Sequence, residues 1–263
     1  MTPFNHHCDV SRRSLPVPAA LADSQPLELG DHDTTESRIM PIPFAAMPSS
    51  AVLIAIPVKP FGVAKQRLAP VLDPEQRRRL GRAVAAHVIT TALATGCTVA
   101  VVTGDEGVAA WAERLGASSI AEPSTGGLNH AAAAAVAAAH RRALAWMILH
   151  ADLPTLTPAD LLDALAATPD NGVLLAPSHD GGTSLIAADL ATFPFAYGRA
   201  SFRRHLSAAA QLAHRVLVRP GLAIDLDGPE DLATAVRLPA GRWLEPLMPQ
   251  ASGDPAPPQG PAR

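Results

Sequence analysis

A short loop in the first half of the sequence gathers three basic side chains. Lys59 follows an uninterrupted apolar run, and Lys65 and Arg67 lie further along the same loop, which also contains Gly62. Lysine ammonium groups, the forked guanidinium of arginine and open backbone amides together suit a chain of phosphates. Ordinary solvated surface charge is the alternative interpretation. The loop is not a Walker motif, because the pattern Gly-x4-Gly-Lys-Ser/Thr is absent from it.

Three carboxylates are candidates for a metal site. Asp152 directly follows an apolar run, whereas Asp225 and Asp227 form Asp-Leu-Asp near the end of the last apolar segment. A carboxylate at the mouth of a buried strand is costly to desolvate without a cation. Two residues that alternate along a strand point to the same side and can share one hard cation. Helix capping is the alternative explanation. Asp227 could cap the helix that begins near Pro229. Asp152 is not needed as a cap, because Thr157 already caps the helix that follows it.

Two glycine-containing loops offer hydroxyl groups and open backbone amides. Gly182 and Thr183 precede a predicted strand, and Gly198 lies shortly before Ser201. We expect Ser201 to be the N-cap of a helix over residues 201–212, so that the exposed amides behind it can bind an anion. Ordinary turn and cap roles explain the same pattern equally well.

The two histidines nearest these loops are weaker candidates. His150 ends the apolar run before Asp152, and His205 falls inside the helix predicted after Ser201. Histidines in such positions are more often packing or rim residues than catalysts. No convincing Ser/His/Asp or Cys/His constellation accompanies them.

The candidate loops lie between segments that alternate between strand-like and helix-like patterns. Short apolar runs indicate buried strands, and longer segments with Pro at the first helical position and Gly at the end indicate helices. The alternation predicts an α/β fold with a mainly parallel sheet between helical layers, whose ligands bind beyond the carboxyl ends of the strands. The expected strands cover residues 51–58, 98–103, 118–121, 145–150, 173–176, 183–187, 215–218 and 222–226, and the expected helices cover 73–94, 105–115, 129–142, 158–167, 201–212 and 229–236.

The composition changes at both ends of the chain. Residues 1–48 mix Pro, Asp, Ser and His with little periodicity, which predicts a flexible extension, and Met47 is an alternative start of translation. Residues 239–263 are rich in proline and predict a flexible tail. The folded domain is expected to cover residues 49–238.

The overall composition excludes several classes of protein. Apolar residues make up 48% and charged residues 17% of the sequence, which is typical of a globular chain. A formal net charge of −3 offers no basic surface to nucleic acid or anionic lipid. The spacing of Cys8 and Cys97 suggests neither a disulfide framework nor a zinc site. Because a long apolar run and a secretory signal are also absent, we expect a cytoplasmic protein with no membrane partner.

Taken in order, the loops resemble those of the phospholactate guanylyltransferases of deazaflavin coenzyme F-420 biosynthesis. That family is similar to the wider group of nucleotidyltransferases with a GT-A-like, Rossmann-like domain. The resemblance covers about residues 52–236. It is carried by Val58-Lys59, Ala64-Lys65-x-Arg67-Leu68-Ala69-Pro70, Gly127-Leu128-Asn129, Asp152-Leu153-Pro154, Gly182-Thr183, Gly198 with Ser201 and Arg204-His205, and Pro220-Gly221-Leu222 leading to Asp225-Leu226-Asp227-x-Pro229-Glu230-Asp231-Leu232.

The resemblance implies a role for each group of candidate residues. The ligands of Mg²⁺ would be Asp152, Asp225 and Asp227. The catalytic side chains acting on the triphosphate would be Lys59, Lys65, Arg67 and Asp152. The substrate-binding residues would be Gly182, Thr183, Gly198 and Ser201 around the phosphorylated acid, and Asn129 near the nucleotide.

The resemblance also implies the reaction. Such enzymes transfer GMP from GTP to 2-phospho-L-lactate, phosphoenolpyruvate or 3-phospho-D-glycerate and release pyrophosphate. The implied partners are GTP and the acid, with product hand-off to the next transferase and a homodimer as further possibilities, and no nucleic acid. One stretch departs from the family pattern, since Asp180-Gly181-Gly182-Thr183 stands where Gly-Thr-Gly-Thr is usual. A more polar rim there favours 3-phospho-D-glycerate, whose extra hydroxyl it can satisfy.

Other functions remain compatible with the same residues. A molybdopterin guanylyltransferase or another cofactor or sugar nucleotidyltransferase would share the metal and phosphate loops. A glycosyltransferase would rest on Asp-Leu-Asp alone, and a non-catalytic nucleotide-binding module would use the loops without chemistry. These classes differ in whether pyrophosphate is released and with which acceptor.

Overall fold

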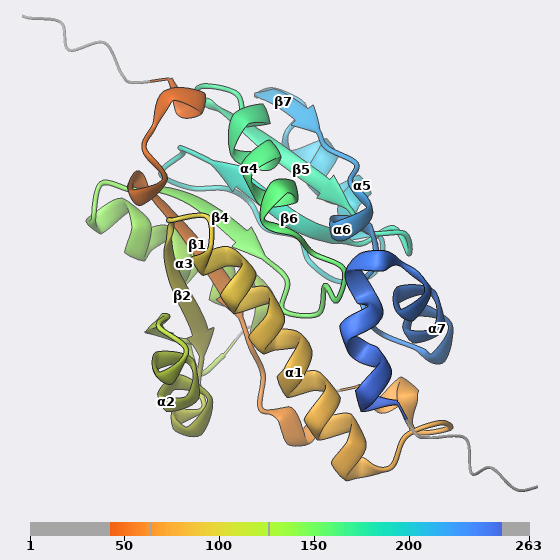
Figure 1. Ribbon diagram of the computed structural model, residues 1–263. Helices are drawn as coiled ribbons and strands as arrows, with labels where there is room; N and C mark the ends of the chain where they lie inside the picture. The colour runs from red at the N-terminus through yellow and green to blue at the C-terminus, as the bar shows by residue number, and fades with distance from the viewer. Residues whose placement is uncertain (1–42, 64, 126, 249–263) are drawn as a thin grey trace, which may run out of the picture. The chain divides into compact units, whose positions relative to one another are not determined.

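The computed structural model describes residues 43–63, 65–125 and 127–248, which belong to one compact unit. Within these residues, seven strands form one sheet that is flanked by helices (Figure 1). The strands are β1 (Val52–Pro57), β2 (Thr98–Thr103), β3 (Ser118–Ala121), β4 (Ala145–Leu149), β5 (Gly172–Pro177), β6 (Thr183–Ala188) and β7 (Ala213–Val216). The α-helices are α1 (Pro74–Leu93), α2 (Glu106–Arg114), α3 (Gly127–Arg141), α4 (Pro158–Ala167), α5 (Ser201–Ala208), α6 (Pro220–Ala223) and α7 (Pro229–Arg237). The 3-10 helices are η1 (Phe44–Ala46), η2 (Ser49–Ala51), η3 (Phe61–Val63), η4 (Gln66–Leu68) and η5 (Pro239–Leu247).

The sheet is mixed and mainly parallel, which confirms the fold class expected from the alternating pattern. Its strand order is β3-β2-β1-β4-β6-β5-β7. β1 runs parallel to β2 and β4, β2 parallel to β3, and β5 parallel to β7. β6 is antiparallel to both β4 and β5. Consequently the carboxyl ends of β1 to β5 and the first residue of β6, Thr183, lie at the same edge of the sheet.

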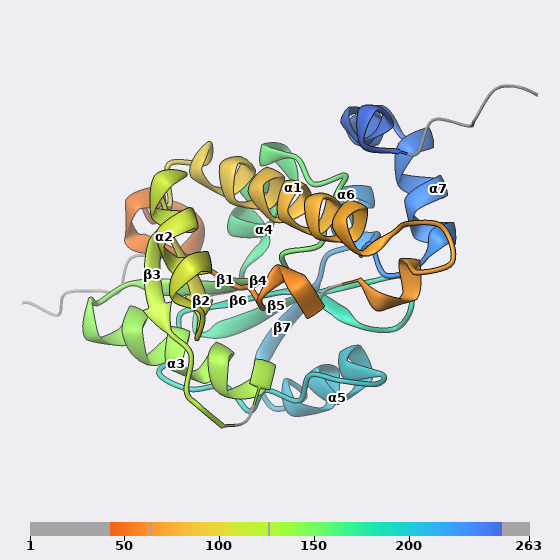
Figure 2. The ribbon, with the colours of Figure 1, turned by 90° about the horizontal axis from the view of Figure 1, so that it is seen from below.

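Helices cover both faces of the sheet. Figure 2 shows α1 and α4 on one face, and α3 and α5 on the other. Successive side chains of β1 enter opposite layers, as strand geometry requires: Ile54 packs in the cluster that includes α1 and α4, whereas Leu53 packs in the cluster that includes α3. Because both faces are covered, β1 reads in the sequence as an unbroken apolar run.

Local signals begin the helices where the sequence predicts. Asp73 accepts a hydrogen bond from the backbone of Gln76 in a reciprocal capping box, and Pro74 occupies the first turn of α1. Thr157 and Asp160 form the equivalent box at the start of α4. These caps also position the site, because α1 and α4 are the helices that follow the loops of Lys65 and Asp152 along the chain.

The strand predicted over residues 222–226 is wrong. Residues 220–223 form the short helix α6, and an irregular segment leads from it to Asp227. Leu222 and Leu226 are fully buried, so the apolar pattern reports burial of individual side chains rather than strand pairing. Asp225 and Asp227 therefore lie in a loop, and the alternation argument that placed them on one side of a strand does not apply.

The predicted tail and extension are corrected where the structure describes them. Residues 239–247 form η5, in which Leu244 is fully buried and Trp243 stacks on His87 with ring centroids 4.9 Å apart. At the other end, Phe44 is buried in the main core. The prediction of flexibility rested on the proline content of these segments and overlooked the large apolar side chains that pack against the domain. The rest of both predicted flexible segments, residues 1–42 and 249–263, lies outside the described residues. Across the described ranges, no helix has the length and apolar character of a membrane span.

Candidate active site

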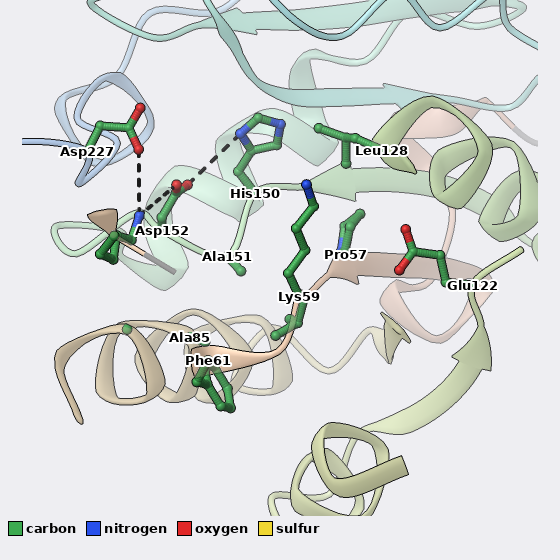
Figure 3. A pocket seen from close by; sticks show the side chains of 13 residues that line it. Pro57, Lys59, Phe61, Ala85, Glu122, Leu128, His150, Ala151, Asp152 and Asp227 are labelled. Atoms are coloured by element: carbon green, nitrogen blue, oxygen red, sulfur yellow. Dashed lines mark hydrogen bonds and ion pairs between the residues drawn. The ribbon is translucent and has the colours of Figure 1, made fainter. Parts of the chain in front are cut away.

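Three loops meet at the edge of the sheet around the side chain of Lys65. The Leu226 backbone N–H donates to the Asp152 carbonyl oxygen at 2.8 Å, which joins the loop after β4 to the loop after α6. Lys65 Nζ lies 3.0 Å from Asp152 Oδ2 and 3.8 Å from Asp227 Oδ1. Figure 3 shows Asp152 and Asp227 close together at one end of the cavity, with their ion pairs drawn as dashed lines. The structure thus brings together two of the aspartates and one of the lysines that the sequence indicates.

The Lys65 backbone is held in an unfavourable conformation. Its φ of 58° lies in the left-handed region, which costs a non-glycine residue about 1–2 kcal/mol. Its side chain is only 10% exposed and is enclosed between two carboxylates. Strain of this kind persists where surrounding contacts over-determine it, and it is concentrated at functional sites.

The other two cations of the loop are more exposed. Lys59 lines the adjoining cavity and, among the described residues, forms no ion pair. Arg67 reaches Asp227 with an Nη1–Oδ2 distance of 3.4 Å, but its side chain is 77% exposed. Solvent screens such a contact, so it contributes little to stability. Lys59 and Arg67 can therefore bind an anionic ligand, whereas Lys65 already forms ion pairs with Asp152 and Asp227.

Asp225 completes an acidic cluster with Asp180 and Asp227. One carboxylate oxygen from each lies within 4.8 Å of the others. Burial, together with the negative charges of Asp152 and Asp180, raises the pKa of Asp225 to about 6. Asp225 Oδ1 and Asp152 Oδ1 are buried and accept no hydrogen bond. Asp225 Oδ1 also lies 3.3 Å from His179 Nδ1. An oxygen-only donor set with buried carboxylate oxygens that accept no hydrogen bond fits a hard divalent cation such as Mg²⁺.

Asp180 is a member of this cluster that the sequence did not indicate as a metal ligand. Its Oδ1 accepts hydrogen bonds from Ser178 Oγ at 2.6 Å and from the Gly182 N–H at 2.8 Å. A Cβ at position 182 would lie 2.5 Å from Ser178 Oγ and 2.9 Å from Asp180 Oδ1, so a larger residue there would displace these two side chains from their hydrogen bonds. The departure from the family pattern thus adds a carboxylate beside Asp225 and Asp227. The available signal was its place after β5, comparable to that of Asp152 after β4.

Thr183, Ser201 and His205 form a separate, buried hydrogen-bonded cluster. The Ala196 N–H donates to His205 Nε2 at 2.8 Å, so the imidazole proton lies on Nδ1, which is 2.9 Å from Thr183 Oγ1. Ser201 Oγ also donates to Thr183 Oγ1, at 3.2 Å. Burial, with the positive charge of Arg204, lowers the pKa of His205 to about 4 and keeps it neutral. The Thr183 hydroxyl accepts two hydrogen bonds and keeps its own hydrogen for a third partner.

The predicted capping role of Ser201 is wrong. Ala200, with a left-handed φ of 52°, is the N-cap of α5, and Ser201 is the first helical residue. The helix ends at Ala208 instead of continuing to residue 212. Ser201 is only 3% exposed, and its hydroxyl is directed into the Thr183 cluster. One amide at this helix end is already used, because the Phe202 N–H donates to the Gly181 carbonyl oxygen at 3.2 Å.

Tyr197 connects the Thr183 cluster to the cavity. Its ring centroid lies 4.7 Å from that of His205 and 5.3 Å from that of His150, which lines the cavity. Tyr197 Oη and His150 Nε2 are both buried and have no hydrogen-bond partner in the described structure. Burial raises the pKa of Tyr197 and lowers that of His150, so both groups are neutral. Unpaired polar atoms of this kind mark a place where a polar ligand fits.

Asn129 and Gly198 shape the loop that carries Tyr197. Asn129 Oδ1 accepts a hydrogen bond from the Tyr197 N–H at 2.7 Å, so one observed role of Asn129 is to fix this loop. Gly198 has a φ of 115°, which side-chain-bearing residues rarely adopt. Asn129 lies near the start of α3 and Gly198 shortly before α5, and the sequence predicts both to bind substrate.

The cavity itself opens at the carboxyl ends of the strands, where ligands bind in such folds. Its volume is about 370 Å³, within the range of small-molecule sites. The polar side chains that line it are Lys59, Lys65, Glu122, His150, Asp152 and Asp227. Thr183, Gly198 and Ser201 are not among its lining residues. Lys59, Lys65 and Asp152, predicted to act on the triphosphate, line the cavity, whereas Asn129, predicted near the nucleotide, and the predicted acid-binding residues lie outside its lining.

The chain is similar to several known proteins. A family model described as "Guanylyl transferase CofC like" matches residues 52–237. A phosphoenolpyruvate guanylyltransferase from Nocardia farcinica is 40% identical over 207 residues, covering 75% of this chain and 91% of that protein. A protein with the same name from Mycolicibacterium gilvum is 35% identical over 202 residues, covering 74% and 93%. A solved structure from Desulfovibrio desulfuricans, described as a nucleotide-diphospho-sugar transferase, shares the fold with a TM-score of 0.61 at 17% identity, covering 75% of this chain and 96% of that one.

Proposed function

This chain belongs to the CofC-like family of guanylyltransferases, and on that premise we propose that it transfers GMP from GTP to phosphoenolpyruvate with the help of Mg²⁺. Guanylyl transfer in coenzyme F-420 biosynthesis follows from the family. The acceptor, the metal ion and the role of each site residue are the proposed parts. The observation that supports them is the position of Lys65, which pairs with both Asp152 and Asp227, beside a cluster in which Asp180 and Asp225 lie close to Asp227.

The reaction joins two anions, so it depends on charge neutralisation and positioning. A phosphate-ester oxygen of the acceptor attacks the α-phosphorus of GTP, and the bond to pyrophosphate breaks. The acceptor phosphate has a second pKa near 6 and is already a dianion at about pH 7, so no general base is required. Lys59 and Arg67, both exposed at this edge, bind phosphate oxygens, while Lys65 stabilises charge that develops beside Asp152.

The acidic cluster would hold the magnesium ion. Asp225, Asp227 and Asp180 offer oxygens close enough to share one cation, and Asp152 lies on the other side of Lys65. When bound, Mg²⁺ would neutralise charge on the phosphates and help to align them. The protein supplies the fixed carboxylates, the basic loop and the main-chain bond that keeps the two acidic loops adjacent.

Phosphoenolpyruvate is the favoured acceptor for two reasons. The curated relatives carry that substrate in their name. In addition, Asp180, whose polarity favoured 3-phospho-D-glycerate, hydrogen-bonds to Ser178 and Gly182 and belongs to the acidic cluster. We therefore assign the exposed Asp180 carboxylate to the metal site and not to the acid. The Thr183 hydroxyl, Tyr197 Oη and His150 Nε2 provide the polar groups for the acid.

The proposal is tested by incubating the protein with GTP and Mg²⁺ and with phosphoenolpyruvate, 3-phospho-D-glycerate or 2-phospho-L-lactate in turn. We expect release of pyrophosphate with phosphoenolpyruvate and a product of the corresponding mass, captured with the next transferase of the pathway. Pyrophosphate release with none of the three acids would refute it. A molybdopterin guanylyltransferase would respond only to its own acceptor, a glycosyltransferase would release no pyrophosphate, and a nucleotide-binding module would give no turnover.

We expect Ser201→Ala to raise the KM for the acid about tenfold, the usual effect of losing one hydrogen bond, with little change for GTP. Ser201 donates to the Thr183 hydroxyl, so its loss frees that hydroxyl to rotate away from the acid. Initial rates at varied acid and varied GTP measure the two constants. Ser207→Ala, on an exposed position of the same helix, is the matched control. Equal changes in both constants, or a large loss of thermal stability, would indicate a purely structural role.

A further inference from the structure

Glu122 is a carboxylate of the cavity to which no role has been assigned. It directly follows β3, and its backbone N–H donates to the Thr103 carbonyl oxygen at 3.0 Å, which fixes it against the end of β2. The facing residue on that side is Gly104, where an added Cβ would lie 4.0 Å from Glu122 Cβ, so no side chain there occupies the space. The Glu122 side chain is partly buried and lines the cavity.

The Glu122 carboxylate has no protein partner in the described part of the chain. No lysine, arginine or histidine in that part forms an ion pair with it, although Lys59 lines the same cavity. A partly buried carboxylate that pairs with nothing gains most from a ligand that donates hydrogen bonds to it. It cannot serve the phosphates, because both would be negatively charged.

The cavity is polarised along its length. Figure 3 places Glu122 at one end, Lys59 near the middle, and Asp152 and Asp227 at the other end. Pro57 and Leu128 contribute apolar surface between Lys59 and Glu122. A nucleotide whose phosphates lie near Lys59 and the acidic cluster therefore extends its base along the apolar surface towards Glu122.

Guanine has a hydrogen-bonding edge that suits a carboxylate. Its N1–H and N2–H₂ groups are adjacent donors, and two carboxylate oxygens can accept from both. Adenine and cytosine present an acceptor next to one donor, and uracil presents one donor between two acceptors. A carboxylate at this place therefore binds guanine more tightly than the other bases. With each of the others, an acceptor atom of the base faces the carboxylate and is left unpaired or repelled.

We propose that Glu122 is the residue that selects guanine, by accepting hydrogen bonds from N1–H and N2–H₂ at the end of the cavity remote from Asp152. This inference rests on the proposed function, because it assumes that GTP occupies this cavity. It assigns the base preference to one side chain after β3 and leaves the acid to the Thr183 cluster.

The test compares GTP with inosine triphosphate, which lacks the N2 amino group, and with ATP. We measure kcat/KM for each nucleotide with phosphoenolpyruvate, and the binding of each nucleotide by calorimetry without acid. Wild type is expected to prefer GTP over inosine triphosphate by roughly tenfold or more, the effect of one hydrogen bond to a charged group, and over ATP by a larger factor. Glu122→Gln is expected to lower kcat/KM and binding affinity for GTP about 100-fold, because the glutamine NH₂ group faces the N2 donor of guanine. The ratio of kcat/KM for GTP to that for inosine triphosphate should then fall close to unity.

Controls separate the possible failures. Glu106→Gln removes a charge from the exposed start of α2, outside the cavity, and should keep the wild-type preference. If Glu122→Gln does not fold, binding of inosine triphosphate and of N1-methyl-GTP to wild type still decides the matter, since each lacks one of the two donors. An unchanged preference in Glu122→Gln, or equal binding of all three guanine-like nucleotides to wild type, would overturn the inference. Absence of pyrophosphate release in wild type with every acid would instead overturn the proposed function, while the binding data would still report on Glu122.

Discussion

Asp152→Asn is expected to give a folded protein whose turnover is lower by on the order of 10³ or more, equivalent to about 4 kcal/mol of transition-state stabilisation. Fold and local backbone should survive, because the hydrogen bond from Leu226 uses the main-chain carbonyl of residue 152. The side chain is different. Although burial opposes its ionisation, the nearby Lys65 ammonium holds the pKa of Asp152 below its usual value, so the group acts as a full negative charge. An amide removes that charge and releases Lys65 from its closest partner.

Turnover is measured as pyrophosphate release at saturating GTP, acid and Mg²⁺, and folding is checked by thermal denaturation. Asp189→Asn, an exposed aspartate after β6, is the matched control and should behave like wild type. Near-wild-type turnover of Asp152→Asn at saturating Mg²⁺ would remove Asp152 from the machinery of the reaction.

Asp225→Asn is expected to lower turnover by at least about 100-fold and, at the same time, to stabilise the metal-free protein. The Asp225 carboxyl has a pKa of about 6 in the folded protein because of burial and because of the charges of Asp152 and Asp180. The unfolded chain has the ordinary, lower value, so the folded state holds this proton more tightly. Metal-free wild type therefore gains stability as the pH falls from above 6 towards about 4, and carries the full penalty at higher pH.

Removing the charge should raise the free energy of unfolding of the metal-free protein by on the order of 2 kcal/mol at alkaline pH. In a chain of this size, each kcal/mol corresponds to roughly 2–4 °C in Tm. The measurement is a melting curve in chelator at about pH 8.5, where the imidazole of His179, 3.3 Å from Asp225 Oδ1, carries little charge. Added Mg²⁺ should raise the Tm of wild type but not that of the variant. A variant that melts lower than wild type in chelator, or that is stabilised equally by Mg²⁺, would contradict this account.

The fold was predictable from the sequence because the relevant signals are local. Buried strands such as Val52–Pro57 read as apolar runs, and the caps at Asp73 and Thr157 mark the starts of their helices. The segment around Leu222 and Leu226 was misassigned, since side chains buried singly against a core give the same apolar pattern as a strand. Likewise, proline content hid Trp243, whose N–H donates to the Pro154 carbonyl oxygen at 2.9 Å.

The site was predictable only in part, because residue types suggest chemistry but not mutual contact. Lys65, Asp152 and Asp227 could be selected one by one as candidates at strand ends, and the structure brings them together. Nothing in the spacing indicates that Lys65 lies between the two carboxylates. Asp180 was considered only for the polarity of the acid pocket and was missed as a metal ligand, and Tyr197 was not selected, since neither a carboxylate before Gly-Gly nor a tyrosine before Gly has a distinctive pattern. Their roles depend on long-range packing.

The bond between the Leu226 amide and the Asp152 carbonyl also bears on how this enzyme can diverge. Both groups belong to the main chain, so the bond does not depend on which side chain stands at either position. Exchanges of residue type in the two loops therefore leave their spacing intact, whereas an insertion or deletion in either loop shifts the register of the peptide groups and separates them. Lineages descended from such a scaffold can therefore exchange side chains in these two loops by point substitution, while the lengths of the loops are constrained.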